Sequence, residues 1–186
     1  SRAAWRAWLE RHHATSPGVW AVTRKKAAGS RPVSMADLSE EALCFGWVDS
    51  LPRKLDAARS MLLVTPRKAR SGWSRLNKER VERLLRAGRM APAGIAAVEA
   101  ARRGGTWNAL DQVEALTIPD DLAVRLAHAP KAALQNFEAF PRSVKRAILE
   151  WIHGARRSET RTRRIEETVS QATRNRRANQ WRQGRA

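Results

Sequence analysis

A change in the spacing of apolar residues near residue 70 limits the possible folds more than any other pattern in the chain. Before it, short segments such as "WVDSL" and "RSMLLVTP" are bounded by turn residues, which is typical of β-strands. After it, apolar residues recur at the three- and four-residue spacing of helices. The sequence therefore predicts an α+β fold. We expect a small, mainly antiparallel sheet with helices, followed by an all-helical C-terminal domain.

Helix starts can be read from capping residues. Ser34 and Asp37 form a capping-box pattern before "MADLSEEALCF", and Gly46 ends that helix. "PRKLD" between two strand segments is expected to be a turn. A further helix is expected from about Trp73. The apolar residues expected on one side of that helix are Trp73, Leu76, Leu84 and Leu85.

The same patterns suggest four parts of the chain. Residues 1–105 are expected to form the α+β domain and 106–117 a linker. Residues 118–174 are expected to form the helical domain, which opens with acidic residues after Pro119 that suit a helix start. The apolar stripe stops past Asn175, so 175–186 is expected to be a mobile basic tail, with weak, non-specific attraction to nucleic acid or anionic membrane.

Charge points to an anionic partner. The 186 residues include 36 Lys+Arg and 18 Asp+Glu, for a net charge of +18. Two blocks, 52–90 and 141–186, carry most of that excess. Arginine-rich composition also follows from a GC-rich genome, which would say nothing about partners. One cysteine and the lack of a long apolar run or export signal favour a soluble, cytoplasmic protein without a transmembrane segment.

Catalytic chemistry has few candidates. Cys44 is the single thiol, and it falls near a helix C-terminus between apolar neighbours, where a thiolate is disfavoured. The four histidines and the acidic residues show no metal-ligand spacing, and no glycine-rich phosphate loop is present. We therefore expect no metal and no cofactor, and we assign no catalytic residue.

The stretch "TPRKARSGWSRLNKERV" is the best candidate for a binding site. Arg67, Lys68 and Arg70 precede Ser71 and Ser74, either of which could cap the following helix. A helix N-terminus beside cations and hydroxyls favours an anion. The alternative is an ordinary solvated turn. Aromatic stacking with nucleic acid is a separate possibility, for which the sequence allows only Trp20, Trp47 and Trp107.

Several ordered motifs resemble one known family. "EEALCFGWVDS", "PRK" followed by "SGWSRLNKERV", "GRMAPAG", "IPDDL" and "ARRSETRTRRIEETV" are similar to those of the bacterial YdeI/OmpD-associated, or bacteriocin-protection, family. The resemblance implies a role in protection against bacteriocins, antimicrobial peptides or stress. It implies no catalytic residues.

We therefore expect a protein that acts by binding an anionic small molecule or protein partner. The candidate ligand-binding residues are Glu41, Trp47, Asp49, Arg67, Lys68, Ser71, Ser74 and Asn77. Trp47 and Asp49 are two apart on a strand, so their side chains should share one face. If the role of Asp49 is structural instead, it pairs with Arg53 or Arg67 and only fixes the fold.

Two further functions are compatible with the sequence. A nucleic-acid-binding protein would use the basic surface formed by the two charged blocks. An enzyme would use Cys44 or a serine as nucleophile.

Overall fold

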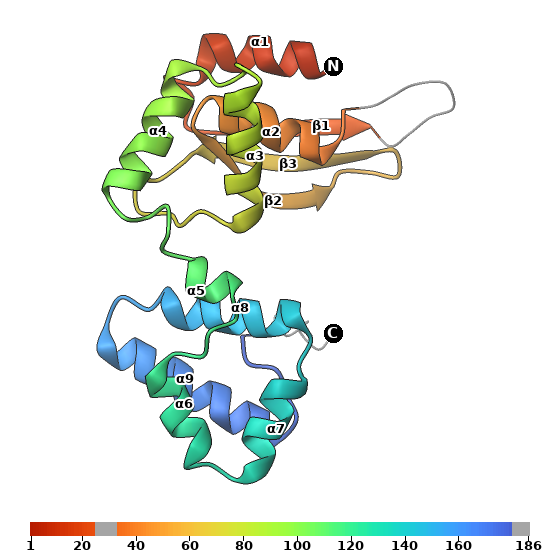
Figure 1. Ribbon diagram of the computed structural model, residues 1–186. Coiled ribbons are helices and arrows are strands. Elements are labelled where there is room, and N and C mark those ends of the chain that lie inside the picture. The colour runs from red at the N-terminus through yellow and green to blue at the C-terminus, as the bar shows by residue number, and fades with distance from the viewer. Residues whose placement is uncertain (25–32, 180–186) are drawn as a thin grey trace. The chain divides into compact units, whose positions relative to one another are not determined.

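The computed structural model describes residues 1–24 and 33–179 (Figure 1). The chain divides into two compact units, Ser1–Ala109 and Leu110–Ala186. The first unit holds a three-stranded sheet with helices, and the described part of the second is entirely helical. This confirms the predicted fold class. Residues 106–117, expected as a linker, contribute Trp107 to the first core and Leu110 and Val113 to the second.

The sheet of the first unit is antiparallel, in the order β1-β3-β2. Its strands are β1 (Val19–Arg24), β2 (Trp47–Lys54) and β3 (Arg59–Pro66). The prediction of a turn at "PRKLD" is wrong for its first three residues, because β2 continues through Pro52, which pairs with Leu62. Proline is tolerated there because β2 is an edge strand and needs no donor on its outer side.

Four helices complete the described part of the first unit: α1 (Arg2–His12), α2 (Met35–Cys44), α3 (Arg75–Arg86) and α4 (Pro92–Arg103) (Figure 1). The predicted capping box is confirmed, since the Ser34 hydroxyl accepts from the Asp37 N–H and Asp37 accepts from the Ser34 N–H. Ser74, but not Ser71, caps α3 by accepting from the Asn77 N–H. The prediction that Ser71 could cap it is wrong because the helix begins later.

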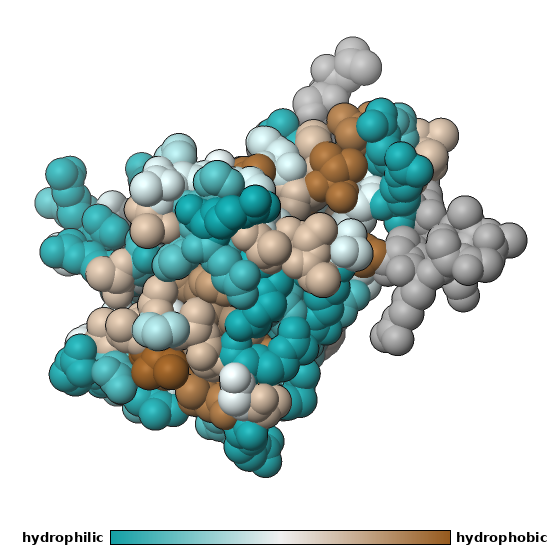
Figure 2. Space-filling model, turned by 90° about the horizontal axis from the view of Figure 1, so that it is seen from above, coloured by the Kyte–Doolittle hydropathy of each residue, from teal (hydrophilic) through white to brown (hydrophobic). Residues whose placement is uncertain are grey.

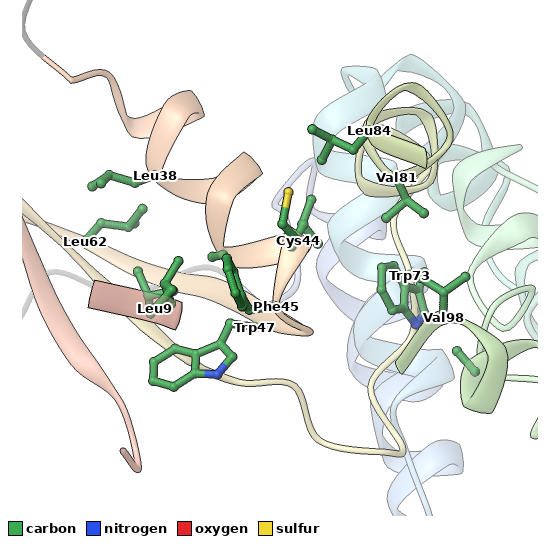
Figure 3. Packing of buried hydrophobic residues seen from close by; sticks show 14 of the residues in the cluster. Leu9, Leu38, Cys44, Phe45, Trp47, Leu62, Trp73, Val81, Leu84 and Val98 are labelled. Atoms are coloured by element: carbon green, nitrogen blue, oxygen red, sulfur yellow. The ribbon is translucent and has the colours of Figure 1, made fainter. Parts of the chain in front are cut away.

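The core of the first unit lies between the helices and one face of the sheet (Figure 3). The predicted buried side of α3 is partly wrong. Leu76 and Leu85 are 55% and 36% exposed, whereas Val81 and Leu84 are buried. The error arises because Trp73 precedes the helix, so its burial does not set the helix phase.

Three of the seven tryptophans in the described residues, Trp47, Trp73 and Trp107, are buried. Trp47 and Trp107 are 1% and 9% exposed, so the expectation that they could stack on nucleic acid is wrong. Trp47 donates from Nε1 to the His13 carbonyl, and Trp107 packs on Trp73. Of the three candidates, only Trp20 keeps a partly exposed ring on the sheet.

The helices of the second unit, as far as residue 179, are α5 (Asp111–Glu114), α6 (Asp120–Ala127), α7 (Lys131–Ala139), α8 (Arg142–His153) and α9 (Ser158–Thr173). Its core gathers Phe137, Ile148 and Ile152 with the apolar sides of α6 and α9. Ala178, within the expected mobile tail, is 2% exposed in this core. The rest of that tail, from residue 180, lies outside the described residues.

Hydrophilic residues occupy much of the face seen in Figure 2, with smaller hydrophobic patches between them. Within residues 1–24 and 33–179, no helix combines the length and apolar character needed to cross a membrane.

Candidate functional site

The segment that joins β3 to α3 holds an arginine in an unusual environment. The backbone N–H of Arg67 donates to the Gly46 carbonyl at 3.1 Å, which fixes the start of the segment. Its guanidinium carbon lies 3.8 Å from the centroid of the Trp73 ring. Nη1 donates to the Ser71 hydroxyl at 3.1 Å and to the Gly72 carbonyl at 3.0 Å. The side chain is therefore held against a buried indole by its own loop.

The charge of Arg67 is only partly compensated. Burial lowers the pKa of its guanidinium to about 10, although the charge of Asp49 acts in the opposite direction. Nε is buried without a hydrogen-bond partner, and no carboxylate among the described residues forms an ion pair with this side chain. A buried cation normally has an anionic partner, because its desolvation is costly. Arg67 thus keeps a charge at neutral pH and one donor to offer.

A cavity of about 190 Å³ adjoins this guanidinium. Its lining residues are Arg67, Lys68, Ala69 and Trp73 from the loop, with Ala97, Ala100 and Ala101 from α4. The two cations are the charged groups of the wall, and the remaining side chains are apolar. Such a cavity suits a small molecule with one anionic group and a small apolar body.

The predicted site residues fall into two groups. Arg67 and Lys68 line the cavity, and Ser71 orients Arg67 while donating to the Lys68 carbonyl at 2.9 Å. Asp49 lies on β2, where it pairs in register with the buried Val64 and contributes its charge to Arg67. Since Trp47 pairs with Pro66 in the same ladder, Trp47 and Asp49 share one face of the sheet, as predicted.

The remaining predicted residues have local structural partners. Ser74 caps α3, and Asn77 accepts from Arg80 at 3.2 Å through its side-chain oxygen. Trp47 is bound to His13 in the core, and Glu41 is engaged by arginines of α1 and of the segment after α3. None of these four residues lines the cavity beside Arg67.

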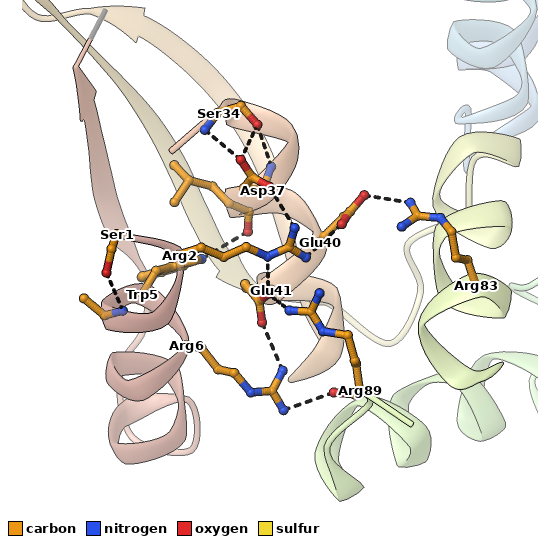
Figure 4. A network of polar contacts seen from close by, with 12 residues as sticks. Ser1, Arg2, Trp5, Arg6, Ser34, Asp37, Glu40, Glu41, Arg83 and Arg89 are labelled. Carbon is orange, nitrogen blue, oxygen red and sulfur yellow. Dashed lines mark hydrogen bonds and ion pairs between the residues drawn. The ribbon is translucent and has the colours of Figure 1, made fainter. Parts of the chain in front are cut away.

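Glu41 is the centre of a separate buried ion-pair cluster (Figure 4). Its side chain is fully buried and accepts from Arg2 Nε at 2.6 Å and from Arg6 Nη1 at 3.0 Å. Arg89 Nη2 donates to it as well. These arginines tie α1 and the segment after α3 to α2. Three cations around one buried carboxylate make Glu41 a cross-link of the fold.

Cys44 is one turn along α2 from Glu41. Its side chain is buried, and burial, with the charge of Glu41 in second place, raises the pKa of the thiol. A raised pKa leaves little thiolate at neutral pH, so the arrangement opposes nucleophilic attack. Within the described parts of the chain, no three His, Cys, Asp or Glu side chains are grouped closely enough to hold a metal ion.

The second unit has a larger cavity of about 480 Å³ between α6 and α9. Its wall includes Asp121, Arg125 and Glu166, and each of these three side chains forms an ion pair. Arg161 binds Asp121 at 2.6 Å and Arg125 binds Glu166 at 2.9 Å. Asp120, the other charged residue of the wall, forms no ion pair among the described residues. This cavity therefore differs from the one beside Arg67, because its one cation, Arg125, is already paired.

Sequence reasoning missed the alanine wall of the cavity. Ala97, Ala100 and Ala101 recur at the spacing of one helix face, which is a detectable signal in "PAGIAAVEAARRGG". Which partner such a face meets depends on tertiary contacts. The position of α4 against α2 depends in part on Gly94, because a Cβ there would lie 2.2 Å from the Cys44 carbonyl oxygen. The helix can approach α2 this closely only at a glycine.

The fold and site define a chain of two modules, an α+β unit with an arginine-lined cavity and an all-helical unit. Residues 1–97 match the model of a domain of unknown function (DUF8412). Residues 115–175 match the family described as bacteriocin-protection, YdeI or OmpD-associated. The chain thus belongs to the first family, whose model covers just more than half its length, and residues 115–175 of its helical unit form a region that matches the YdeI/OmpD-associated family.

The family resemblance expected from the sequence is confirmed by the match in the helical unit. The motifs quoted from the first unit, up to "GRMAPAG", instead fall within the residues matched by the domain of unknown function. No curated protein and no solved structure matches the chain.

Proposed function

We propose that the chain is a binding protein for a small organic anion and that the cavity beside Arg67 is its binding site. The observation that carries the proposal is the buried, unpartnered Nε–H of a guanidinium that is only partly compensated by Asp49 and lies beside an open space. A carboxylate or phosphate oxygen at this donor would supply the missing hydrogen bond and the missing countercharge. Lys68 would add a second cation at the wall.

The apolar part of the wall indicates what accompanies the anionic group. Trp73 already has one ring face occupied by Arg67, and the alanines of α4 provide shallow apolar contacts. A volume of about 190 Å³ is small compared with the roughly 300–1,000 Å³ typical of ligand pockets. The best candidates are therefore short aliphatic or single-ring carboxylates.

Binding, rather than catalysis, is the proposed contribution of this chain to bacteriocin protection, the role for which the family matched by its helical unit is named. The buried thiol of Cys44 with its raised pKa gives an enzymatic function little support. Nucleic-acid binding would depend on exposed surface in a different part of the first unit, and it does not compete for the cavity.

Isothermal titration calorimetry with acetate, butyrate, benzoate and inorganic phosphate tests the proposal. We expect saturable one-site binding of at least one carboxylate to the unmodified protein, and its loss in Arg67→Met. Arg70→Met is the matched control, because Arg70 is an exposed cation of the same loop that does not line the cavity. If Arg67→Met and the unmodified protein bound every anion with equal affinity, this result would contradict the proposal.

A further inference from the structure

The sheet of the first unit presents two different faces. Leu62 and Val64 of β3 are buried in the core, so residues in register with Leu63 and Met61 point to the opposite side, here called the outer face. The apolar residues of the outer face include Trp20, Val22, Leu51, Met61 and Leu63.

These apolar residues remain accessible. Val22 is 50% exposed and Leu51 42% exposed, and the remaining three are partly exposed. Helix α2 packs against β2 and β3, and its buried Leu38 lies beside Leu62 on the core side (Figure 3). A contiguous apolar sheet face that the unit's own helices leave open is typical of an interaction surface.

Three arginines lie at one end of this surface. The guanidinium carbon of Arg53 lies 5.2 Å from the centroid of the Trp20 ring. Arg24 and Arg59 are directly opposite each other in the β1–β3 ladder, an arrangement that costs free energy because like charges face each other. Asp56 in the adjoining turn binds Arg59 at 2.7 Å, but no carboxylate occupies an outer-face position in the three described strands. An external polyanion would relieve this repulsion.

We propose that the outer face binds single-stranded nucleic acid. A partly exposed tryptophan on an antiparallel sheet, with neighbouring apolar side chains, offers a platform on which unpaired bases stack, and the arginines would contact the phosphates. A second copy of the chain fits less well, since it would bring Arg24, Arg53 and Arg59 against their own counterparts without carboxylates to pair them. Duplex DNA fits less well too, because its base faces are not accessible. The surface shares no residue with the cavity beside Arg67.

Fluorescence anisotropy with a labelled oligo-dT and a duplex of matched length tests this inference on the full chain. We expect the single strand to bind more tightly than the duplex. Trp20→Leu should weaken single-strand binding by about 5- to 150-fold, the effect of losing one stacked base. Arg53→Gln should weaken binding and reduce the salt slope by about 0.7, as for one lost phosphate contact on a single strand.

Two variants serve as controls and keep this inference separate from the proposed function. Arg103→Gln removes an exposed cation of α4 that lies away from the sheet, and it should leave the affinity nearly unchanged. Arg67→Met should abolish binding of the small anion but leave oligo-dT binding intact. If Trp20→Leu unfolds the protein, ultraviolet cross-linking of oligo-dT to the unmodified chain tests instead whether nucleic acid binds at the outer face. The cross-link is expected on the peptide that carries Trp20.

Three results would overturn the inference. The first is equal affinity for duplex and single strand, which would mean general charge attraction. The second is a cross-link confined to peptides that lack the outer face. The third is a dimer in analytical ultracentrifugation that Val22→Ser or Leu51→Ser dissociates, because the outer face would then be an interface between copies of the chain.

Discussion

The guanidinium of Arg67 lies against the ring of Trp73, 3.8 Å from guanidinium carbon to ring centroid, while its Nε–H has no acceptor. The two residues are six positions apart and belong to one loop, so the loop itself builds this contact. Trp73 is 1% exposed and therefore cannot move away. The pair thus forms a rigid wall of the cavity, and within that wall one buried donor has no acceptor.

Replacing Trp73 with leucine should therefore affect both stability and binding. The substitution removes buried aromatic volume and the ring that supports Arg67, so we expect a loss of about 2–4 kcal/mol in the free energy of unfolding, by comparison with large-to-small core substitutions. Anion affinity should fall even where the variant is folded. Urea unfolding, monitored by circular dichroism, measures the free energy of unfolding. Calorimetric titration of the folded variant measures the anion affinity. A stable variant with unchanged anion affinity would show that the ring does not position Arg67.

Glu41→Gln should be one of the most damaging small changes in the first unit. It removes the charge that three arginines share at a fully buried carboxylate. We expect a loss of about 3 kcal/mol, the lower end for breaking a buried pair, because the arginines are themselves partly exposed. The measurement is the urea midpoint. Glu99→Gln, at an exposed pair on α4, is the control and should change the midpoint little.

Acid should weaken the first unit through two carboxylates beside Glu41. Hydrogen bonds from Ser34, with help from Arg2, lower the pKa of Asp37, and a hydrogen bond from Arg83 lowers the pKa of Glu40. Groups with a lowered folded pKa contribute stability that is complete above the unfolded pKa and is lost as pH falls through the folded value. The losses should therefore begin below the ordinary values of 4.5 for Glu40 and 3.8 for Asp37.

Urea midpoints measured from about pH 7 to about pH 3 check this dependence. The urea midpoint of the unmodified protein should exceed that of the double variant Asp37→Asn, Glu40→Gln by the largest margin at neutral pH. This difference in midpoint should shrink as the carboxylates become protonated. A difference that stays constant over the whole range would mean that neither group's ionisation contributes to folding.

Gly94→Ala tests the close approach of α4 to α2. The added methyl group would meet the Cys44 carbonyl oxygen at 2.2 Å, and that carbonyl also accepts from the Ala91 N–H at 2.9 Å. Because the obstructing atoms are backbone, relief requires α4 to move, and we expect a loss of about 1–3 kcal/mol, as for overpacking. The loss of stability is measured by thermal unfolding. Gly154→Ala, where the new methyl group would meet its nearest atom at an ordinary 3.4 Å, should be nearly neutral.

Local sequence signals predicted much of the fold. The capping box at Ser34 and Asp37 and the strand that ends at Pro66 both rest on near neighbours, and both are present. The continuation of β2 through Pro52 was not predictable, because it depends on pairing with Leu62. Burial of Val81 in place of Leu76 likewise depends on the neighbours of α3, which its sequence does not specify.

The candidate site was predictable to a similar degree. Arg67 and Lys68 stand out in a basic turn, and the structure places both at one cavity. The stacking of Arg67 on Trp73 and the alanine wall of α4 arise from tertiary packing. From the sequence, Glu41 was predicted to bind a ligand. In the structure it pairs with Arg2 and Arg89, which are distant in sequence, so its role is an ion pair within the fold.

Anion binding beside Arg67 can be followed at the atom that carries the proposal, by proton–nitrogen NMR of the arginine Nε–H groups during titration with benzoate. We predict that one signal, assigned by its absence in Arg67→Lys, shifts saturably because the carboxylate supplies the missing acceptor. The signals of Arg2 and Arg6, which already donate to Glu41 or Glu10, should stay in place. An Arg67 signal that does not move with any anion of the panel, while the protein remains folded, would contradict anion binding at this cavity.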